Sequence, residues 1–334
     1  MPHAQSRAAE RGRARSVLQT AQPSERLLLG RHDKSTGLAA SGLNPLGDGD
    51  ACGIEPPADR LWAGVGAARR WARQVLWSVF FATAATAQPR CDKPVYLTFD
   101  TGHMGVAPLI ADTLKRHNAK ATFFLASEPT LTGGTTLDDT WAPWWRERVA
   151  EGHAFGAHTW DHDVFLADLP AADGQPAGFK VRTQAGINPP VVRELSSAQY
   201  CASLKKVGER FATMTGRALD PLFRAPGGRT SAALVAAAKA CGFSHVGWSP
   251  AGFLGDELPS QSFPSSQLLE KALRDIKPGD ILIAHLGIWQ RQDPWAPAVL
   301  EPLLTGLEQR GLCFASLRDH PRYAPLLAPQ AKAP

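Results

Sequence analysis

The alternation of strand-like and helix-like segments constrains the fold of this 334-residue chain more than any other feature. Runs rich in β-branched, aromatic and aliphatic residues predict strands at 95–100, 121–126, 153–158, 222–225, 243–249, 281–285 and 312–317. Helical spacing of apolar residues predicts helices at 106–117, 144–150, 196–214, 230–240, 265–276 and 297–310. Strands that alternate with helices are typical of a parallel sheet or barrel, so we expect an α/β protein with seven such strands.

A stretch rich in Pro and Gly interrupts the alternation at residues 163–195. Long insertions of this kind are uncommon in compact domains and often contribute to binding. We therefore expect this insertion to form a rim of a substrate groove; an idle surface loop is the alternative.

The first 87 residues have a different character. Residues 1–64 are rich in Arg, Gly, Ala, Ser and Pro without an amphipathic period, so we expect them to be disordered or not translated at all. A basic stretch at 69–73, an apolar run at 75–85 and an Ala-Thr-Ala site at 85–87 then follow. This order is typical of a secretory signal peptide over 65–87 and predicts export to the periplasm or the exterior. Because the apolar run is short for a membrane span, no stable anchor is expected after cleavage.

The formal net charge of +5 belongs entirely to this leader. Residues 1–90 hold 12 Lys or Arg and 7 Asp or Glu, which leaves 24 basic and 24 acidic residues in the remainder. A nucleic-acid-binding domain normally carries a basic excess, so we expect no nucleic-acid partner. The oligomeric state cannot be deduced from the sequence.

The chain has five cysteines, and four of them, Cys91, Cys201, Cys241 and Cys313, lie beyond the leader. In an exported protein these four can form one or two disulfides, because the compartment is oxidising. Buried free thiols are the alternative, and the sequence does not decide between the two.

The tripeptide Asp100-Thr-Gly also occurs in aspartic proteases. Those enzymes need two aspartates that share a proton, and a single chain must supply two such tripeptides. This chain contains the tripeptide once, and its alternating pattern does not fit an all-β protease. An aspartic protease is therefore not expected.

Polar or aromatic residues end several of the expected strands: Asp100, His158, Arg224, Trp248 and His285. The carboxyl ends of barrel strands meet on one face, which is where α/β barrels hold their active sites. His158 and His162 are four residues apart, so one helical turn would bring both imidazoles to one metal ion. Surface or capping histidines are the alternative, which the position at a strand end disfavours.

Together these segments resemble the polysaccharide deacetylases of the NodB-homology type, carbohydrate esterase family 4. The order and spacing of five motifs agree with the family over about residues 93–320. The matching segments are Thr98-Phe-Asp-Thr-Gly102, His158-Thr-Trp-Asp-His162, Arg224-Ala-Pro-Gly-Gly228, Trp248 and Ile281-Leu-Ile-Ala-His285.

The resemblance implies a fold and a set of catalytic groups. The family fold is a distorted (β/α)7 barrel, here a catalytic domain over 93–320 followed by a tail over 321–334. Asp100 matches the general base that takes a proton from water, and His285 matches the general acid that protonates the leaving amine. Arg224 matches the residue that orients the base.

A divalent metal ion is also implied, with Zn²⁺ favoured by imidazole ligands and by family habit. By the resemblance, His158 and His162 match metal ligands, and the backbone N–H of Gly227 matches the position that stabilises the oxyanion. Sugars stack on aromatic rings. Trp248 and Trp160 stand beside motif residues and are the expected substrate contacts.

The chain departs from the family at two positions. Thr101 stands where the family has a metal-binding carboxylate, and a neutral hydroxyl is a weaker ligand. Thr101 can ligate weakly or through water, His103 or Asp100 can fill in, or metal and catalysis have been lost. Ser244 stands where the family has the carboxylate that tunes the acid histidine, which leaves the pKa of His285 open.

The expected function is metal-dependent removal of acetyl groups, N-acetyl foremost, from a polysaccharide such as a cell-wall glycan or a chitin-like oligosaccharide. One alternative is a catalytically inactive carbohydrate-binding protein on the same scaffold, which Thr101 keeps open. Another is a related hydrolase of a different non-peptide C–N bond.

We predict that translation begins near Val65, because signal peptides stand at the N-terminus of a precursor and this one starts about sixty residues into the chain. Mass spectrometry of the precursor in its native cell should find peptides from residue 65 onward and none from 1–60. Peptides from 1–60 would contradict the prediction.

Overall fold

The computed structural model describes residues 91–327, apart from 172–176, 185–189, 290, 292 and 294. All of these lie in the second of two units of the chain, Phe81–Pro334. The predictions of a disordered leader and a signal peptide over residues 1–87 fall outside the described residues. So does the end of the predicted C-terminal tail, from residue 328.

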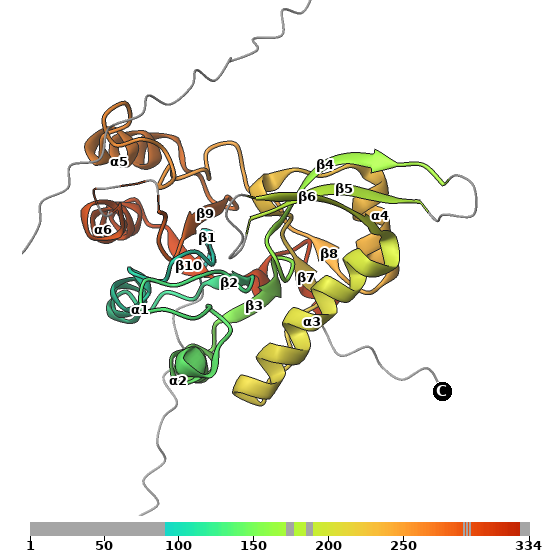
Figure 1. The fold of residues 1–334 in the computed structure, drawn as a ribbon. Coiled ribbons are helices and arrows are strands. Elements are labelled where there is room, and N and C mark those ends of the chain that lie inside the picture. The colour runs from blue at the N-terminus through green and yellow to red at the C-terminus, as the bar shows by residue number, and fades with distance from the viewer. Residues whose placement is uncertain are drawn as a thin grey trace, which may run out of the picture. The chain divides into compact units, whose positions relative to one another are not determined.

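β1 (Pro94–Asp100) lies at the centre of a seven-stranded sheet in which all pairings are parallel (Figure 1). It pairs with three strands, namely β2 (Thr122–Leu125), β9 (Ile281–His285) and β10 (Cys313–Ala315). The sheet continues from β2 through β3 (Ala154–Ala157) and β7 (Leu222–Phe223) to β8 (Ser244–His245). β7 and β8 are two residues long, shorter than predicted.

The sheet curls back on itself between β8 and β9. After β8 the chain runs beside β9, where the Ser249 N–H donates to the Ile281 carbonyl at 3.0 Å and the Leu254 N–H to the Ile283 carbonyl at 3.2 Å. A parallel bridge joins Phe253 to Ile283. The prediction of an α/β barrel-like fold with seven parallel strands is therefore confirmed.

Helices cover the outside of this sheet (Figure 1). They are α1 (Ala107–Arg116), α2 (Ala142–Ala150), α3 (Ser197–Thr215), α4 (Ala232–Ala240), α5 (Ser265–Asp275), α6 (Glu301–Gln309) and the short α7 (Ala324–Leu327). Single helical turns lie at Asp139–Trp141, Pro226–Gly228, Ala296–Leu300 and Leu317–Asp319. Within the described part of the chain, no helix has the length and apolar character needed to cross a bilayer.

The longest helix, α3, shows how local sequence sets the ends of an element. Ser196 caps its first turn: its side chain accepts from the Gln199 N–H, and the Gln199 side chain accepts from the Ser196 N–H. Gly216 ends the helix in the left-handed conformation at φ 74°. The predicted end at this glycine is confirmed.

The side chains of the central strands form two layers, because successive residues of a strand point to opposite faces. Phe99, Phe123 and Phe155 lie in register on β1, β2 and β3 and stack at 5.8 and 5.9 Å under the helices. Tyr96 belongs to a separate cluster inside the barrel. Asp100 has the same parity as Tyr96, so its carboxylate points into the interior at the carboxyl end of β1.

The insertion at 163–195 forms a small antiparallel sheet rather than a loop. Its strands are β4 (Asp163–Leu169), β5 (Gly178–Thr183) and β6 (Val191–Ser196). In β5, buried Phe179 and Val181 alternate with exposed Lys180 and Arg182, a period of two that is typical of a half-buried strand. The Pro and Gly content hid this alternation in the sequence.

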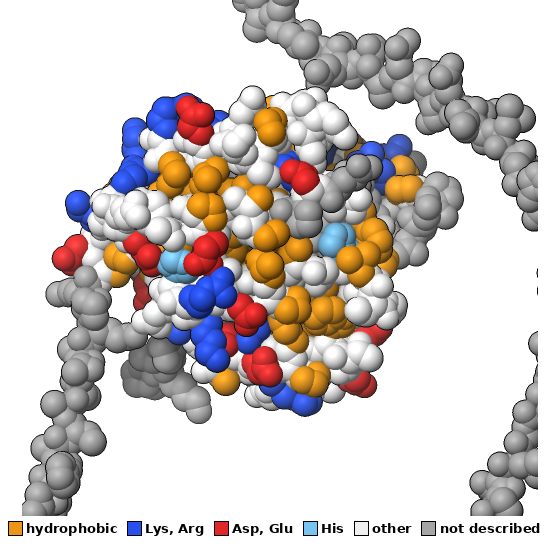
Figure 2. All heavy atoms as spheres, turned by 90° about the vertical axis from the view of Figure 1, so that its left-hand side faces the viewer, with side chains coloured by type: hydrophobic (Ala, Val, Ile, Leu, Met, Phe, Trp, Pro, Cys, Tyr) orange, Lys and Arg blue, Asp and Glu red, His pale blue; other side chains and the backbone are white. Residues whose placement is uncertain are grey.

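Hydrophobic and charged side chains are interspersed on the face formed by α1, α5 and α6 (Figure 2). Both signs of charge occur there, and neither covers the face. This distribution agrees with the balanced charge of residues 91–334 and gives no support to a nucleic-acid surface on this side of the molecule.

Two disulfides tie distant parts of the fold together. Cys91–Cys313 joins the start of β1 to β10 across 222 residues, and Cys201–Cys241 joins α3 to the end of α4 across 40 residues. All four cysteines beyond the leader are therefore paired in the structure.

We predict that none of the four cysteines beyond the leader reacts with iodoacetamide when the unreduced protein is unfolded in denaturant. Replacing both Cys201 and Cys241 by Ala should lower the free energy of unfolding by about 2–5 kcal/mol, because a disulfide restricts the unfolded chain. Intact mass and denaturant titration measure the two quantities. Alkylation of any of the four cysteines without reductant would contradict the pairing.

Candidate active site

The carboxyl ends of the barrel strands surround a cavity of about 730 Å³. Among the predicted site residues, six contribute to its lining: Asp100, Thr101, His162, Gly227, Trp248 and His285. Gln184 and Pro190, which flank β5 and β6, also line it, so the insertion contributes to the wall of this cavity. His158 and Arg224 are buried directly behind the cavity and contact Asp100.

Asp100 and Arg224 form a buried ion pair. The Arg224 Nη1 donates to Asp100 Oδ1 at 2.8 Å, and neither side chain is more than 3% exposed. Burial alone would raise the pKa of Asp100, but the charge of Arg224, helped by His158 and His285, outweighs it and lowers the pKa. Asp100 is therefore a carboxylate at neutral pH.

Arg224 is itself held rigidly. Its guanidinium also lies within donor distance of the Val246 and Gly247 carbonyls, at 3.4 and 3.3 Å. It stacks over the Phe124 ring at 4.4 Å. A buried guanidinium with this many partners can fix the direction of the Asp100 carboxylate, which is the orienting role implied by the family resemblance.

His158 has the protonation state that a metal ligand needs. Its Nδ1 lies 2.9 Å from the Arg224 carbonyl oxygen, which can only accept, so Nδ1 carries the proton. Burial is the main cause that lowers the pKa of His158 to about 4, so the ring is neutral. Its Nε2 keeps a free lone pair 3.5 Å from Asp100 Oδ2.

His162 lies beside His158, with ring centroids 5.0 Å apart. The predicted helical turn between them is absent: Thr159 and His162 both adopt left-handed φ angles, 56° and 50°. The Asp163 N–H donates to the Thr159 hydroxyl at 2.8 Å and tightens this non-helical turn. The two imidazoles meet as expected, but through a strained turn. The Nδ1 of His162 is buried without a hydrogen-bond partner.

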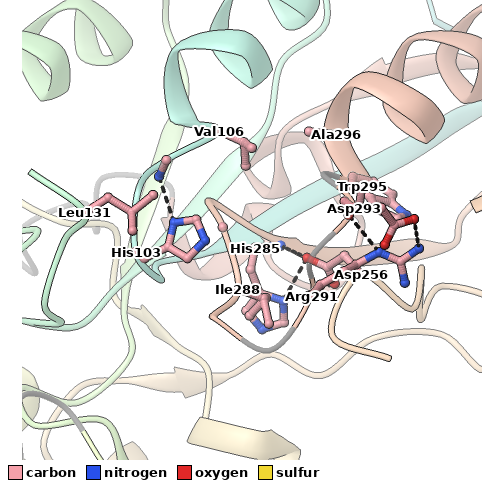
Figure 3. Close-up of a pocket in the computed structure, with 12 residues that line it drawn as sticks. His103, Val106, Leu131, Asp256, His285, Ile288, Arg291, Asp293, Trp295 and Ala296 are labelled. Carbon is pink, nitrogen blue, oxygen red and sulfur yellow. Dashed lines mark hydrogen bonds and ion pairs between the residues drawn. The ribbon is translucent and has the colours of Figure 1, made fainter. Parts of the chain in front are cut away.

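Thr101 is buried at the same cavity, and its hydroxyl oxygen accepts the Ala126 N–H at 3.0 Å. The alternative ligand His103 does not line this cavity. Its Nδ1 accepts the Gly105 N–H at 2.9 Å (Figure 3). Its ring lies against Gly287 and Trp289. His103 therefore does not fill the place of the missing carboxylate.

Asp256 is a functional residue that the sequence analysis did not identify. It accepts the His285 backbone N–H at 2.6 Å and lies 3.1 Å from the His285 Nδ1 (Figure 3). Burial would lower the pKa of His285, but Asp256, with Asp100 and Glu257, outweighs it and raises the pKa to about 9. His285 is therefore protonated at neutral pH although Ser244 is not an acid.

One signal in the sequence could have pointed to Asp256. It and Glu257 are the only acidic residues between Asp220 and Glu270. Only the tertiary structure shows that this segment returns to the end of β9, where the Phe253–Ile283 bridge holds it.

A second cavity, of about 250 Å³, lies behind His285 (Figure 3). It shares His285, Gly287 and Ile288 with the larger cavity. Val106 and Leu131 add apolar walls. Asp100 and the two imidazoles of the His158–His162 turn do not line it, so the groups of the predicted chemistry gather around the larger cavity.

Two glycines allow the close packing around Trp248. Gly227 and Gly228 have φ angles of 62° and 65°. A side chain at Gly228 would come within 2.4 Å of the Trp248 ring. The tip of the Trp248 ring can therefore approach this turn closely, and Trp248 presents an aromatic wall to the cavity.

Trp160, the other predicted substrate contact, does not line the cavity. Lys206 Nζ lies 3.9 Å from the centre of its ring, and the backbone N–H of Trp160 donates to the Ser203 hydroxyl at 2.8 Å. Trp289 lies at the groove instead, with 57% of its surface exposed, and packs edge-on against His103.

Comparison with known proteins agrees with this geometry. A family model described as polysaccharide deacetylase matches residues 87–246. A chitooligosaccharide deacetylase of Azorhizobium caulinodans is 28% identical over 238 residues, which cover 67% of this chain and 92% of that protein. Residues 87–246 belong to the polysaccharide deacetylase family.

Other relatives of this deacetylase-family chain agree. The peptidoglycan-N-acetylmuramic acid deacetylase PdaA of Bacillus subtilis is 25% identical over 230 residues, which cover 68% of this chain and 71% of that protein. A solved peptidoglycan N-acetylglucosamine deacetylase shares the fold, with a TM-score of 0.50 at 23% identity over 69% of this chain and 89% of that one. The predictions of a NodB-type fold and of a polysaccharide deacetylase are confirmed.

We predict that Asp256→Asn lowers the pKa of His285 from about 9, because burial then acts without its main opposing charge. NMR titration of the histidine ring measures this pKa. Glu257→Gln is the matched control and should lower it less, since Glu257 makes a smaller contribution. An unchanged titration of His285 in Asp256→Asn would contradict the assignment.

Proposed function

We propose that this protein removes acetyl groups, foremost N-acetyl groups, from a polysaccharide outside the cytoplasm. The observation that carries the proposal is a pair of ionisable groups at one cavity that are held in opposite charge states. Asp100 is kept as a carboxylate by Arg224, and His285 is kept protonated by Asp256. A base and an acid whose pKa values are pushed apart by their surroundings are the usual sign of an acid–base pair.

In the proposed reaction, Asp100 accepts a proton from the water that attacks the acetyl carbonyl. His285 then donates its proton to the nitrogen of the leaving amine, since an amide nitrogen cannot leave as an anion. Arg224 holds the Asp100 carboxylate in place through the 2.8 Å contact. The Gly227 N–H is proposed to stabilise the developing oxyanion, as the family resemblance implies.

The two neighbouring imidazoles fit a divalent metal ion. His158 Nε2 has a free lone pair, and His162 Nδ1 is a buried nitrogen without a partner. Both rings would hold the ion, for which we propose Zn²⁺ because imidazole suits it. When bound, such an ion lowers the pKa of water and polarises a carbonyl oxygen.

The lining of the groove supports a glycan as the substrate. Trp248 and the exposed Trp289 offer aromatic faces on which a sugar ring can stack. A chitooligosaccharide-like polymer fits these properties.

The two disulfides support the proposed export, because disulfides persist in oxidising compartments and are rare in the cytosol. The periplasm or the exterior is therefore proposed as the location, and residues 65–87 as the cleaved signal. The catalytic domain is proposed to span 93–320.

We predict that the mature protein, loaded with Zn²⁺, releases acetate from N-acetylated chito-oligosaccharides. Asp100→Asn should lower kcat by about 100-fold or more, because it removes the base. Its zinc content should stay close to that of the wild type, since both imidazoles remain.

Acetate release and metal analysis of the same samples provide the test. A folded wild type that binds the oligosaccharide but releases no acetate from it or from peptidoglycan would instead support the inactive carbohydrate-binding protein. Full turnover in Asp100→Asn would remove Asp100 as the base.

A further inference from the structure

We propose that Glu128 supplies the anionic oxygen of the metal site that Thr101 cannot supply. The inference rests on the proposed metal dependence and adds a residue from another strand end. Glu128 follows β2, the neighbour of β1, and lines the same cavity as Thr101 and His162.

Two unsatisfied atoms at this cavity carry the inference. The Glu128 Oε2 and the His162 Nδ1 are both buried and have no hydrogen-bond partner. A buried carboxylate oxygen without a partner is costly, since it has lost water and gained nothing in return. Both atoms can donate a lone pair, so a cation in the cavity would satisfy the two together.

The backbone places Glu128 next to the position of the missing carboxylate. The Ala126 N–H donates to the Thr101 hydroxyl oxygen at 3.0 Å, which joins the segment after β2 to the end of β1. Two residues later, the Glu128 N–H and carbonyl are both bonded to Thr136, at 3.2 and 2.8 Å. The backbone of Glu128 is therefore fixed, while one of its carboxylate oxygens has no protein partner.

The charge of Glu128 also favours a cation at this cavity. A carboxylate that lines the same cavity as His162 attracts a cation toward the imidazole pair. It replaces the charge that is lost when Thr101 stands for an aspartate.

The two oxygen donors at the end of β1 have other roles. Asp100 Oδ1 is bonded to Arg224, and recruiting Asp100 as a ligand would compete with its use as a base. The Thr101 oxygen accepts a backbone N–H. In the described part of the chain no three His, Cys, Asp or Glu side chains are gathered closely enough to form a ready-made metal site. The Glu128 side chain must therefore turn toward the imidazoles when the ion binds.

Metal affinity tests this inference without using activity. Zn²⁺ affinity is measured by competition with a chromophoric chelator for the wild type, Glu128→Gln, Thr101→Asp and the double variant. Glu128→Gln should weaken Zn²⁺ binding about tenfold or more. Loss of a residue that only hydrogen-bonds to a metal ligand already lowers metal affinity by about tenfold or more, and loss of a direct ligand should lower it at least as much. Thr101→Asp should strengthen binding and should restore it in the double variant.

Glu257→Gln is the matched control, since it removes another carboxylate from the same groove on the side of His285. It should leave Zn²⁺ affinity within about twofold, since its charge acts from farther away. Circular dichroism and thermal unfolding of the metal-free variants verify that each is folded.

Equal affinities of the wild type and Glu128→Gln would overturn the inference and leave the proposed function intact. A loss of affinity in Glu128→Gln that Thr101→Asp fails to restore would also overturn it, since the two carboxylates would then not be interchangeable. A folded wild type that binds no Zn²⁺ would reject the metal dependence itself, and the acetate assay would then show separately whether any deacetylation remains.

Discussion

The buried ion pair between Asp100 and Arg224 is the interaction on which the site depends. Asp100 lies at the end of the central strand, where burial alone would neutralise its carboxylate. Arg224 prevents this at 2.8 Å and is in turn held by backbone carbonyls and by the Phe124 ring. Its own carbonyl fixes the proton of His158. Arg224, the residue directly after β7, therefore sets both the charge of the proposed base Asp100 and the tautomer of the proposed metal ligand His158.

On the opposite side of the cavity a buried charge is likewise stabilised by a partner of opposite charge, but here the buried group is a cation and its partner is a carboxylate. A buried histidine would ordinarily lose its proton, and Asp256 keeps His285 protonated. The segment after β8, and not the position of Ser244, supplies this carboxylate. We propose that Glu128 compensates for Thr101 in a similar way. In both cases the charge comes from a loop near the site rather than from the expected motif position.

The sequence predicted the seven strands and six residues that line one cavity in the structure. This was possible because strand periodicity and strand order determine which side chains meet. It did not reveal the small sheet β4–β6, whose alternation is masked by Pro and Gly. It placed the His158–His162 pair on a helical turn, whereas left-handed residues form the turn. Substrate contact by Trp160 was expected, but Lys206 covers that ring and Trp289 lines the groove.

The sequence by itself determined the family, the barrel and the residues Asp100, His158, His162, Arg224 and His285, since these lie in short motifs with local spacing. Only the tertiary structure decided which carboxylates accompany them. Asp256 reaches His285 from 29 residues away, and Glu128 reaches the cavity from the neighbouring strand end. Contacts of this kind depend on how the chain closes the barrel, and electrostatic effects depend on distance in space, which no local pattern encodes.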